Sequence, residues 1–306
     1  MRTAFINTLC RLATRDRRVW LLTGDLGFSV LEPFRDRFPD RYVNVGVAEQ
    51  NMTGVAAGLA GCGQIVFTYS IANFPTLRCL EQIRNDVCYH NLPVKVVSVG
   101  GGFAYGPQGY THHGVEDLAV MRALPNMTVV APGDPVETEQ ATQAVIDAPG
   151  PCYLRLGKAR EPVLHRRPIS FTIGRSIRLR EGDDVTLIST GGMLQTALET
   201  AEALASHGVE SRVLSMHTLK PLDDPAVRAA ALETALVVTL EEHSVTGGLG
   251  SAVSEVMAAM IEPHAPLLTY GAPDRVNAAV GSQEYLRAQA GDPVGRVLAL
   301  LKRIRR

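Results

Sequence analysis

The chain has 306 residues, of which 46% are hydrophobic and 20% are charged, and its formal net charge is −1. Its length leaves room for two domains of ordinary size, and its composition is that of a globular protein. A charge so close to zero provides no general attraction to nucleic acid or to an anionic membrane, and no run of about 18 uncharged apolar residues predicts a membrane span.

The first half of the sequence alternates between runs typical of strands and runs typical of helices. In chain order, the pattern predicts a strand over 18–25, a strand over 43–48, a helix over 51–63, a strand over 64–70, a helix over 77–90, a strand over 93–101, a helix over 115–124, a strand over 127–132, a helix over 134–147 and a strand over 152–157. Apolar strands separated by helices indicate a mostly parallel sheet that is covered on both faces.

A segment over 161–180 is rich in charge and proline, which is typical of a linker. The alternation then restarts with a strand over 185–190, a helix over 193–208, a strand over 211–221, a helix over 224–235, a strand over 236–243, a helix over 249–260 and a strand over 266–271. We therefore predict an α/β protein with two doubly wound, mostly parallel-sheet domains, over 1–160 and 181–306.

A long glycine-rich loop, residues 100–114, follows the predicted strand over 93–101. Open α/β sheets place their sites beyond the carboxyl ends of the strands, and loops of this length are often functional. The loop carries the adjacent histidines His112 and His113. A histidine pair in a mobile loop can also be plain solvated surface, but its position favours a site.

Glu49 stands where the strand over 43–48 gives way to the helix that carries Gly54, Gly58 and Gly61. A glutamate near a helix N-terminus is favoured by the helix dipole alone. The glycines, however, recur about once per turn, which predicts close packing against another element or another subunit. Burial there would favour the protonated form of an unpaired carboxyl and would make it a candidate for acid/base chemistry.

Several common catalytic patterns are missing from the sequence. It has no G-x-G-x-x-G, no phosphate-loop pattern, no H-E-x-x-H, no G-x-S-x-G and no cysteine pair with zinc spacing. The segment STGGM, residues 189–193, follows a strand and opens a helix, so its amides can bind an anion. A tight strand-to-helix turn is the simpler interpretation.

Seven segments keep a recognisable order and spacing. They are VNVGVAEQNMTGVAAGLA, FPTLRCLEQIRNDV, GYTHHGVED, NMTVVAPGDPVETEQA and CYLRLGK in the first half, and LKPLD and EEHSVTGGLGSAVSEV in the second. Together they resemble thiamine-diphosphate enzymes of the transketolase family, and the resemblance covers nearly the whole chain.

The resemblance implies the last two of the three transketolase domains, the pyrimidine-binding domain and the C-terminal domain. The domain that carries G-D-G and N-N, and with them Mg²⁺ and the diphosphate, has no counterpart here; the nearest match is Gly24-Asp25-Leu26, in the wrong domain. The chain therefore resembles the β subunit of a split transketolase. A separate diphosphate-binding subunit, a cofactor site for thiamine diphosphate and Mg²⁺ shared with it, and an α2β2 assembly are what this implies.

The resemblance also assigns roles around the cofactor. In the family, the glutamate that matches Glu49 bonds a ring nitrogen of the aminopyrimidine and favours the imino tautomer that takes the thiazolium proton. Phe74 matches the aromatic residue that stacks on the pyrimidine, and core packing is its alternative. Tyr69 is a candidate to line the same pocket. Asp25, with Leu26 beside it, belongs to a loop near the cofactor.

A second group of residues is implied for the substrate, a sugar or sugar phosphate. His112 matches a histidine that faces the reacting centre, and His113 is a weaker candidate. Arg155 matches an arginine that binds a substrate phosphate, with a salt bridge near the linker as its alternative. Ser29 lies in the loop near the cofactor. Gln108 stands where many relatives carry an aspartate that recognises a substrate hydroxyl, so the substrate can differ from the usual pentose phosphate.

The arginines of the helix over 77–90, Arg78 and Arg84, are predicted to form helix ion pairs.

The predicted function is transfer of a two-carbon ketol unit by a transferase that is active only with its partner. The β subunit of a 2-oxo-acid dehydrogenase, a deoxyxylulose phosphate synthase-like subunit and a non-catalytic α/β scaffold remain as alternatives. We expect a cytoplasmic protein, because the charged start of the chain is unlike a signal peptide. Its five cysteines form no C-x-x-C pair and are expected to be reduced.

Overall fold

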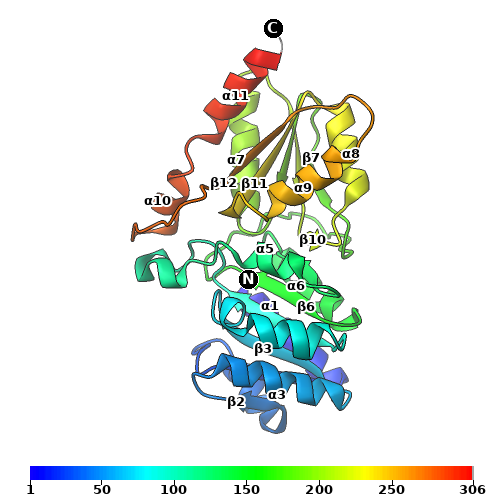
Figure 1. Cartoon of the computed structure of the whole chain (residues 1–306), viewed down its shortest axis with the longest axis vertical. Coiled ribbons are helices and arrows are strands. Elements are labelled where there is room, and N and C mark those ends of the chain that lie inside the picture. Colours follow the sequence, from blue (N-terminus) through cyan, green and yellow to red (C-terminus); the bar gives the residue numbers. More distant parts are fainter. Residues whose placement is uncertain (305–306) are drawn as a thin grey trace.

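A computed structural model describes residues 1–304 of the chain. Figure 1 shows two α/β units stacked along the long axis of the molecule, each with a sheet flanked by helices. The predicted fold class is confirmed: both sheets are mostly parallel and each has one antiparallel edge strand.

The first sheet has the strand order β10-β5-β6-β4-β3-β1-β2, and only β10 is antiparallel to its neighbour. Its strands are β1 (Val19–Thr23), β2 (Tyr42–Asn44), β3 (Ile65–Ile71), β4 (Val94–Val99), β5 (Thr128–Val130), β6 (Cys152–Leu156) and β10 (Thr218–Lys220). The central strands are buried along their whole length, as the continuous apolar runs predicted.

Helices cover both faces of this sheet. They are α1 (Arg2–Arg15), α2 (Glu32–Arg37), α3 (Glu49–Gly61), α4 (Leu80–Gln82), α5 (Asp117–Ala123) and α6 (Pro135–Asp147), with the short turns η1 (Pro39–Arg41), η2 (Leu77–Cys79), η4 (Gly106–Gln108) and η5 (Tyr110–His112) and the π-helical η3 (Ile83–Cys88). One face packs against α1, α2 and α6, and the other against α3, η3 and α5. The predicted helix over 77–90 is thus three short segments of different type.

The second sheet has the order β12-β11-β8-β9-β7, in which β7 is the antiparallel edge. Its elements are β7 (Ile177–Arg180), β8 (Val185–Ser189), β9 (Ser211–Ser215), β11 (Leu236–Ser244), β12 (Leu267–Ala272), α7 (Met193–Ala205), α8 (Asp224–Glu233), α9 (Leu249–Ala258), α10 (Gln283–Ala288) and α11 (Pro293–Ile304). The segment predicted as a linker, 161–180, includes β7 and therefore reaches into this sheet.

The prediction of one strand over 211–221 is wrong. The chain forms β9 in the second sheet, breaks at Met216 and His217, and then forms β10 in the first sheet, beside β5. The apolar cluster on the α3 face of the first sheet also continues into the second unit, where Leu249 and Val253 belong to it. The two units therefore share both a sheet and a core.

The parallel order of β4, β3, β1 and β2 brings the carboxyl ends of these strands to one edge of the sheet. The segments that follow the strands, 24–31, 45–48, 72–78 and 100–114, lie at this edge. None of the described helices is long and apolar enough to cross a membrane. All five cysteines are free thiols, and only Cys62 is exposed.

Candidate active site

Glu49 is the first residue of α3 and is only 1% exposed. Its carboxylate accepts a hydrogen bond from Ser70 Oγ (3.1 Å) and forms an ion pair with Arg78 Nη1 (2.8 Å). A Cβ at Gly24 would lie 3.3 Å from the carboxylate, so the loop after β1 passes directly beside it. The carboxylate is thus buried as predicted but is not unpaired, and the condition that would have favoured its protonated form is not met.

Arg78 has a flat guanidinium that makes two contacts at once. Besides bonding Glu49, it lies over the Phe74 ring, with Cζ 4.7 Å from the ring centroid, and its side chain is 45% exposed. The prediction of an ion pair within the helix is wrong for Arg78, because its partner lies 29 residues away in the sequence. The Arg84 guanidinium, in contrast, donates a hydrogen bond to the neutral side chain of its neighbour Asn85.

The His112 ring stands edge-on to the half-buried Phe74, with the centroids 5.2 Å apart. Its Nδ1 shares a hydrogen bond with Thr111 Oγ1 (3.0 Å), which leaves Nε2 for other partners. Asn73, next to Phe74, donates a hydrogen bond to the His113 carbonyl (2.6 Å) and ties the two segments together. The structure therefore brings Glu49, Phe74 and His112 into one continuous set of contacts.

His113 points into its own loop. It is buried, and its ring packs edge-on against Phe103 at 5.2 Å. Burial lowers the pKa of its imidazole, and neither ring nitrogen has a hydrogen-bond partner among the described residues. The structure corrects the suggestion that His113 meets the substrate, because its place is in the loop's apolar interior.

Two predicted cofactor residues lie on the wrong face of the sheet. Side chains alternate along a strand, so Ser70 points to Glu49 and Tyr69 points to the opposite face. There Tyr69 stacks on Phe5, with the centroids 6.0 Å apart, and Leu26 packs against the same apolar cluster. Tyr69 is thus a core residue, and Leu26 is a half-buried loop residue packed against the same core.

Three predicted site residues are exposed near the open edge. Asp25 exchanges hydrogen bonds with Asn44, both at 3.0 Å, and it adopts a left-handed backbone with φ of 57°. Ser29 follows in the same loop, and its amide is bonded to Glu32. Gln108 is exposed in η4, within the loop that carries His112. The structure gives none of these three side chains a contact with Glu49.

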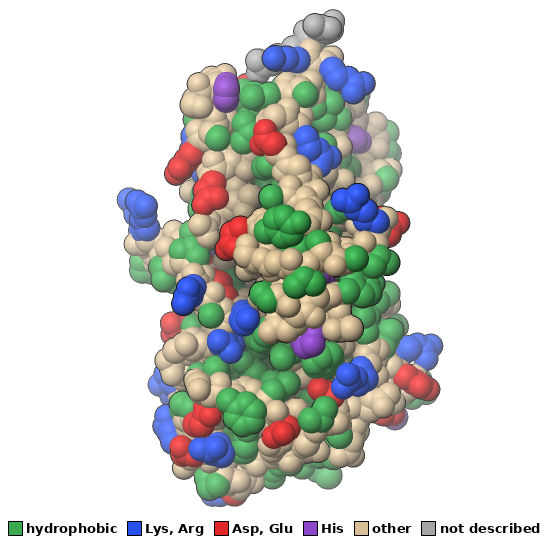
Figure 2. All heavy atoms as spheres, turned by 90° about the vertical axis from the view of Figure 1, so that its left-hand side faces the viewer, with side chains coloured by type: hydrophobic (Ala, Val, Ile, Leu, Met, Phe, Trp, Pro, Cys, Tyr) green, Lys and Arg blue, Asp and Glu red, His purple; other side chains and the backbone are tan. Residues whose placement is uncertain are grey.

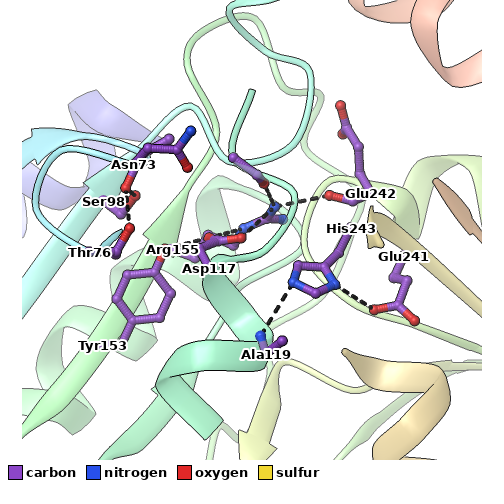
Figure 3. A network of polar contacts seen from close by, with 12 residues as sticks. Asn73, Thr76, Ser98, Asp117, Ala119, Tyr153, Arg155, Glu241, Glu242 and His243 are labelled. Atoms are coloured by element: carbon purple, nitrogen blue, oxygen red, sulfur yellow. Dashed lines mark hydrogen bonds and ion pairs between the residues drawn. The ribbon is translucent and has the colours of Figure 1, made fainter. Parts of the chain in front are cut away.

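Arg155 is buried where the two units meet (Figure 3). Its Nε donates to Asp117 Oδ2 (2.7 Å), and its Nη2 donates to the carbonyls of Gly114 (2.7 Å) and Glu242 (2.9 Å). Burial alone would raise the pKa of the Asp117 carboxyl, but the Arg155 guanidinium, together with His243 and the hydrogen bond from Tyr153, holds that pKa below its usual range. These contacts match the alternative of a salt bridge for Nε and Nη2, whereas Nη1 lies beside Gly191, and the role of Arg155 as a phosphate ligand stays a prediction.

The end of β11 carries three further titratable residues that sequence reasoning missed. Glu241 accepts hydrogen bonds from the Leu249 and Gly250 amides (2.7 and 2.8 Å) at the start of α9, and burial raises the pKa of its carboxyl to about 7. His243 contacts the Ser244 carbonyl through Nδ1 and accepts a hydrogen bond from the Ala119 amide at Nε2. These contacts fix His243 as a neutral imidazole. Glu-Glu-His at the end of an apolar strand was the signal available in the sequence.

Other candidate positions have ordinary roles. The amide of Gly191, in the STGGM turn, bonds the Ala131 carbonyl, and the turn simply connects β8 to α7. Among residues 1–304, no group of three or more His, Cys, Asp or Glu side chains is placed to hold a metal ion.

The fold and the site together have the features of an α/β enzyme subunit: a buried glutamate, a half-buried phenylalanine and a histidine meet at the open edge of a parallel sheet. Residues 1–162 match the transketolase pyrimidine-binding domain, and residues 174–291 match the transketolase C-terminal domain. The chain therefore belongs to the transketolase family.

Three known proteins illustrate the match. The chain is 38% identical to one of the subunits of the apulose-4-phosphate transketolase of Phocaeicola vulgatus, over 95% of this chain and 92% of that protein. It is 39% identical to SqwH, a subunit of the 6-deoxy-6-sulfo-D-fructose transketolase of Clostridium sp., over 95% and 90%. A solved structure described as a split gene transketolase, inactive β4 tetramer, shares a TM-score of 0.89 and 38% identity with it, over 99% of this chain and 97% of that chain. The chain is a transketolase subunit and so part of a transferase.

Proposed function

We propose that this chain supplies the pyrimidine side of a thiamine diphosphate site, and that a partner chain supplies the side that holds the diphosphate and Mg²⁺. In this proposal the complete enzyme transfers a two-carbon ketol unit between sugars. Glu49 is the catalytic carboxylate, Phe74 is the stacking surface and His112 faces the substrate.

The single observation that carries the proposal is the position of Arg78. Its guanidinium is a flat cation that lies on the Phe74 ring and donates a hydrogen bond to the buried Glu49 carboxylate. A protonatable flat ring such as the aminopyrimidine needs the same two partners. The residues therefore fit the group, provided that Arg78 moves aside, and its 45% exposure leaves it free to do so.

When bound, thiamine diphosphate supplies a carbon that stabilises the negative charge left on the transferred unit. Glu49 holds or releases a proton at its carboxylate oxygens, and its burial beside Ser70 keeps water from competing for them.

His112 is the group of this chain that we assign to the substrate. Its Nε2 remains available for a sugar hydroxyl or carbonyl. Lys158 lies nearby, because its Nζ sits 4.4 Å from the centroid of the Tyr105 ring, which in turn is 6.3 Å from the His112 ring. We assign to Lys158 the role first expected of Arg155, contact with an anionic end of the sugar. The names of both relatives specify a sugar with a phosphate or sulfo group, which supports this assignment.

The partner is supported by the surface of α3. Apart from the adjacent backbone of α3 itself, no atom of the described residues lies within 4 Å of a Cβ added at Gly54, Gly58 or Gly61, so the glycine face of this helix is uncovered. A helix face without side chains permits close approach of a second backbone. We propose that this face meets another subunit in an α2β2 enzyme, which brings Glu49 to a cofactor held mainly by the partner.

The proposal is tested by mixing this chain with a diphosphate-binding transketolase subunit, one that carries G-D-G and N-N, in the presence of thiamine diphosphate and Mg²⁺. We expect ketol transfer by the mixture and none by either chain alone. Activity or tight cofactor binding by this chain alone would contradict the split-site proposal. Transfer that survives Glu49→Gln at full rate would contradict the role of Glu49.

A further inference from the structure

The loop that carries His112 is closed at its base. Gly102 and Gly114 exchange two backbone hydrogen bonds, with the Gly102 amide donating at 2.7 Å and the Gly114 amide at 2.9 Å. We call this pair the neck of the loop. Everything between the two glycines, including η4 and η5, projects from the neck, so the position of the neck sets the position of His112.

Glu242 of the second unit bonds one side of the neck directly and is joined to the other side through Arg155. Its carboxylate accepts a hydrogen bond from the Phe103 amide (2.7 Å), next to Gly102. Its backbone carbonyl accepts from Arg155, which also donates to the Gly114 carbonyl. Figure 3 shows the Arg155 guanidinium at the Glu242 carbonyl, while the Glu242 carboxylate points away from it.

Position 102 in the neck requires glycine, because there is no space for a Cβ atom. A Cβ at Gly102 would lie 2.5 Å from the Glu242 Cγ and Cδ atoms, and the backbone φ of +69° is itself unfavourable for other residues. Close contact with Glu242 and a left-handed backbone thus require the same glycine.

The Glu242 carboxylate also holds α10. Gln283 Nε2 donates to both of its oxygens (2.9 and 3.0 Å), and Arg287 Nε and Nη2 donate to Oε2 (3.0 and 2.5 Å). The loop in turn lies against α10, because a Cβ at Gly106 would be 2.5 Å from the Gly281 carbonyl oxygen and 2.6 Å from Leu286. Glu242 is only 5% exposed, so these contacts are made away from solvent.

Figure 2 shows the face of the molecule that bears the histidine loop and α10. Apolar side chains gather near its middle, with charged side chains around them. Tyr110 of the loop and Val280 and Tyr285 beside or within α10 are among the exposed apolar residues. Loop and helix thus form one continuous surface whose internal link is Glu242.

We infer that Glu242 is a positioning residue for His112, through which the second unit and α10 hold the histidine loop in place. Glu242 does not touch the proposed site itself. It acts through Phe103, which packs against His113, the neighbour of His112. A displacement of about 1 Å at a reacting group can cost about a hundredfold in rate, so a firm hold on the neck has a direct kinetic consequence. This role rests on the proposed function, because it requires His112 to act on the substrate.

The test is a mutant cycle in the complex with the diphosphate-binding subunit. We expect Glu242→Ala to lower kcat by roughly tenfold to a hundredfold, while the dissociation constant of thiamine diphosphate changes less than twofold. In a His112→Ala background the same substitution should lower kcat less than twofold, because the group that it positions is gone. Glu242→Gln keeps an acceptor for the Phe103 amide and should recover part of the rate. Glu284→Ala removes an exposed carboxylate from α10, the helix that Glu242 bonds, and serves as the control.

Three results would overturn the inference: a wild-type rate in Glu242→Ala, an equal loss in both backgrounds, or a loss of cofactor affinity parallel to the loss of rate. Amide hydrogen exchange provides a readout that does not need activity. Exchange at Phe103 and across 104–113 should be faster in Glu242→Ala, and unchanged exchange would refute the hold on the neck. If the wild-type pair is inactive, or if His112→Ala is as active as wild type, the proposed function of His112 fails, and the positioning role fails with it.

Discussion

The carboxyl edges of the two parallel sheets offer a direct comparison. At the first edge, Glu49 is buried at the start of α3, and its partner Arg78 is 45% exposed and can leave. At the second edge, Glu241 is buried beside the start of α9, and its partners are the fixed amides of Leu249 and Gly250. Each unit thus places a carboxylate where a strand gives way to a helix.

The difference lies in what satisfies the carboxylate. Side chains and backbone of the same chain fully engage the second edge, and Glu242 there holds α10 and the histidine loop. At the first edge, the partners of the Glu49 carboxylate are the buried Ser70 hydroxyl and the half-exposed Arg78 side chain, which lies over the Phe74 ring. The same fold position therefore has half-exposed side-chain partners in one unit and fixed backbone partners in the other.

The largest effect should come from breaking the buried pair where the edges meet. Arg155→Met leaves the Asp117 carboxylate buried without its cation, and we expect the free energy of unfolding to fall by about 3–5 kcal/mol. Urea denaturation measures it. Arg178→Met, which removes an exposed pair with Glu181, should cost less than about 1 kcal/mol. Equal losses of unfolding free energy in the two variants would mean that the buried pair of Arg155 and Asp117 contributes no more than an exposed surface pair.

Glu241 should make stability depend on pH. Its folded pKa of about 7 lies above the ordinary value of 4.5, so the folded state holds a proton that the unfolded state has lost between those values. Stability from this group is present below pH 4.5 and is lost as pH rises through 7, by roughly 3 kcal/mol at most. Glu241→Gln should abolish this component between pH 5 and 8, whereas Glu202→Gln, at an exposed position of α7, should not. An unchanged pH profile in Glu241→Gln would contradict the assignment.

Arg78→Ala tests whether the Arg78 guanidinium occupies the place that the aminopyrimidine would take beside Glu49 and Phe74. Because the side chain is half exposed, we expect a loss of about 1–2 kcal/mol in the free energy of unfolding. Calorimetry on the complex should show thiamine diphosphate binding several-fold more tightly, since nothing has to leave the Phe74 ring. Arg84→Ala is the matched control. Weaker cofactor binding by Arg78→Ala would make Arg78 a ligand instead of a stand-in.

The smallest effect is expected at Gln108. We expect Gln108→Ala to raise the KM for the sugar by about fivefold, the equivalent of about one hydrogen bond. Cofactor affinity should not change, because Gln108 lies in the loop and away from Glu49. Steady-state kinetics over a panel of sugars measures both quantities, and a KM unchanged for every sugar would remove Gln108 from the site.

The sequence was sufficient where local pattern decides structure. Continuous apolar runs identified the central strands, and the glycine-rich helix after Glu49 marked a buried carboxylate. It was insufficient where distant residues decide. No helix is predicted from the sequence over 2–15, because arginines are scattered along this segment. It nevertheless forms α1, with Phe5, Leu9 and Leu12 buried on a regular apolar face.

Long-range pairing explains the other misses. The segment Thr218–Lys220 leaves the sheet of β9 and pairs with β5 in the first sheet. Nothing in the local sequence predicts this pairing. The ion pair between Arg78 and Glu49 crosses 29 residues, and the contact between Glu242 and Phe103 crosses 139. The prediction for Tyr69 is one residue off, because successive side chains of a strand point to opposite faces of the sheet and Ser70, not Tyr69, points toward Glu49.

In the proposed function, Glu49 holds or releases a proton for a cofactor shared with a partner chain. The most direct measurement is the rate at which the assembled complex exchanges the thiazolium proton of thiamine diphosphate with deuterated water, compared between wild type, Glu49→Gln and the exposed control Glu81→Gln. We expect the exchange rate to fall by about 10²- to 10⁴-fold in Glu49→Gln, with cofactor still bound and the rate of the control unchanged. Exchange at the wild-type rate in fully loaded Glu49→Gln would contradict this role of Glu49.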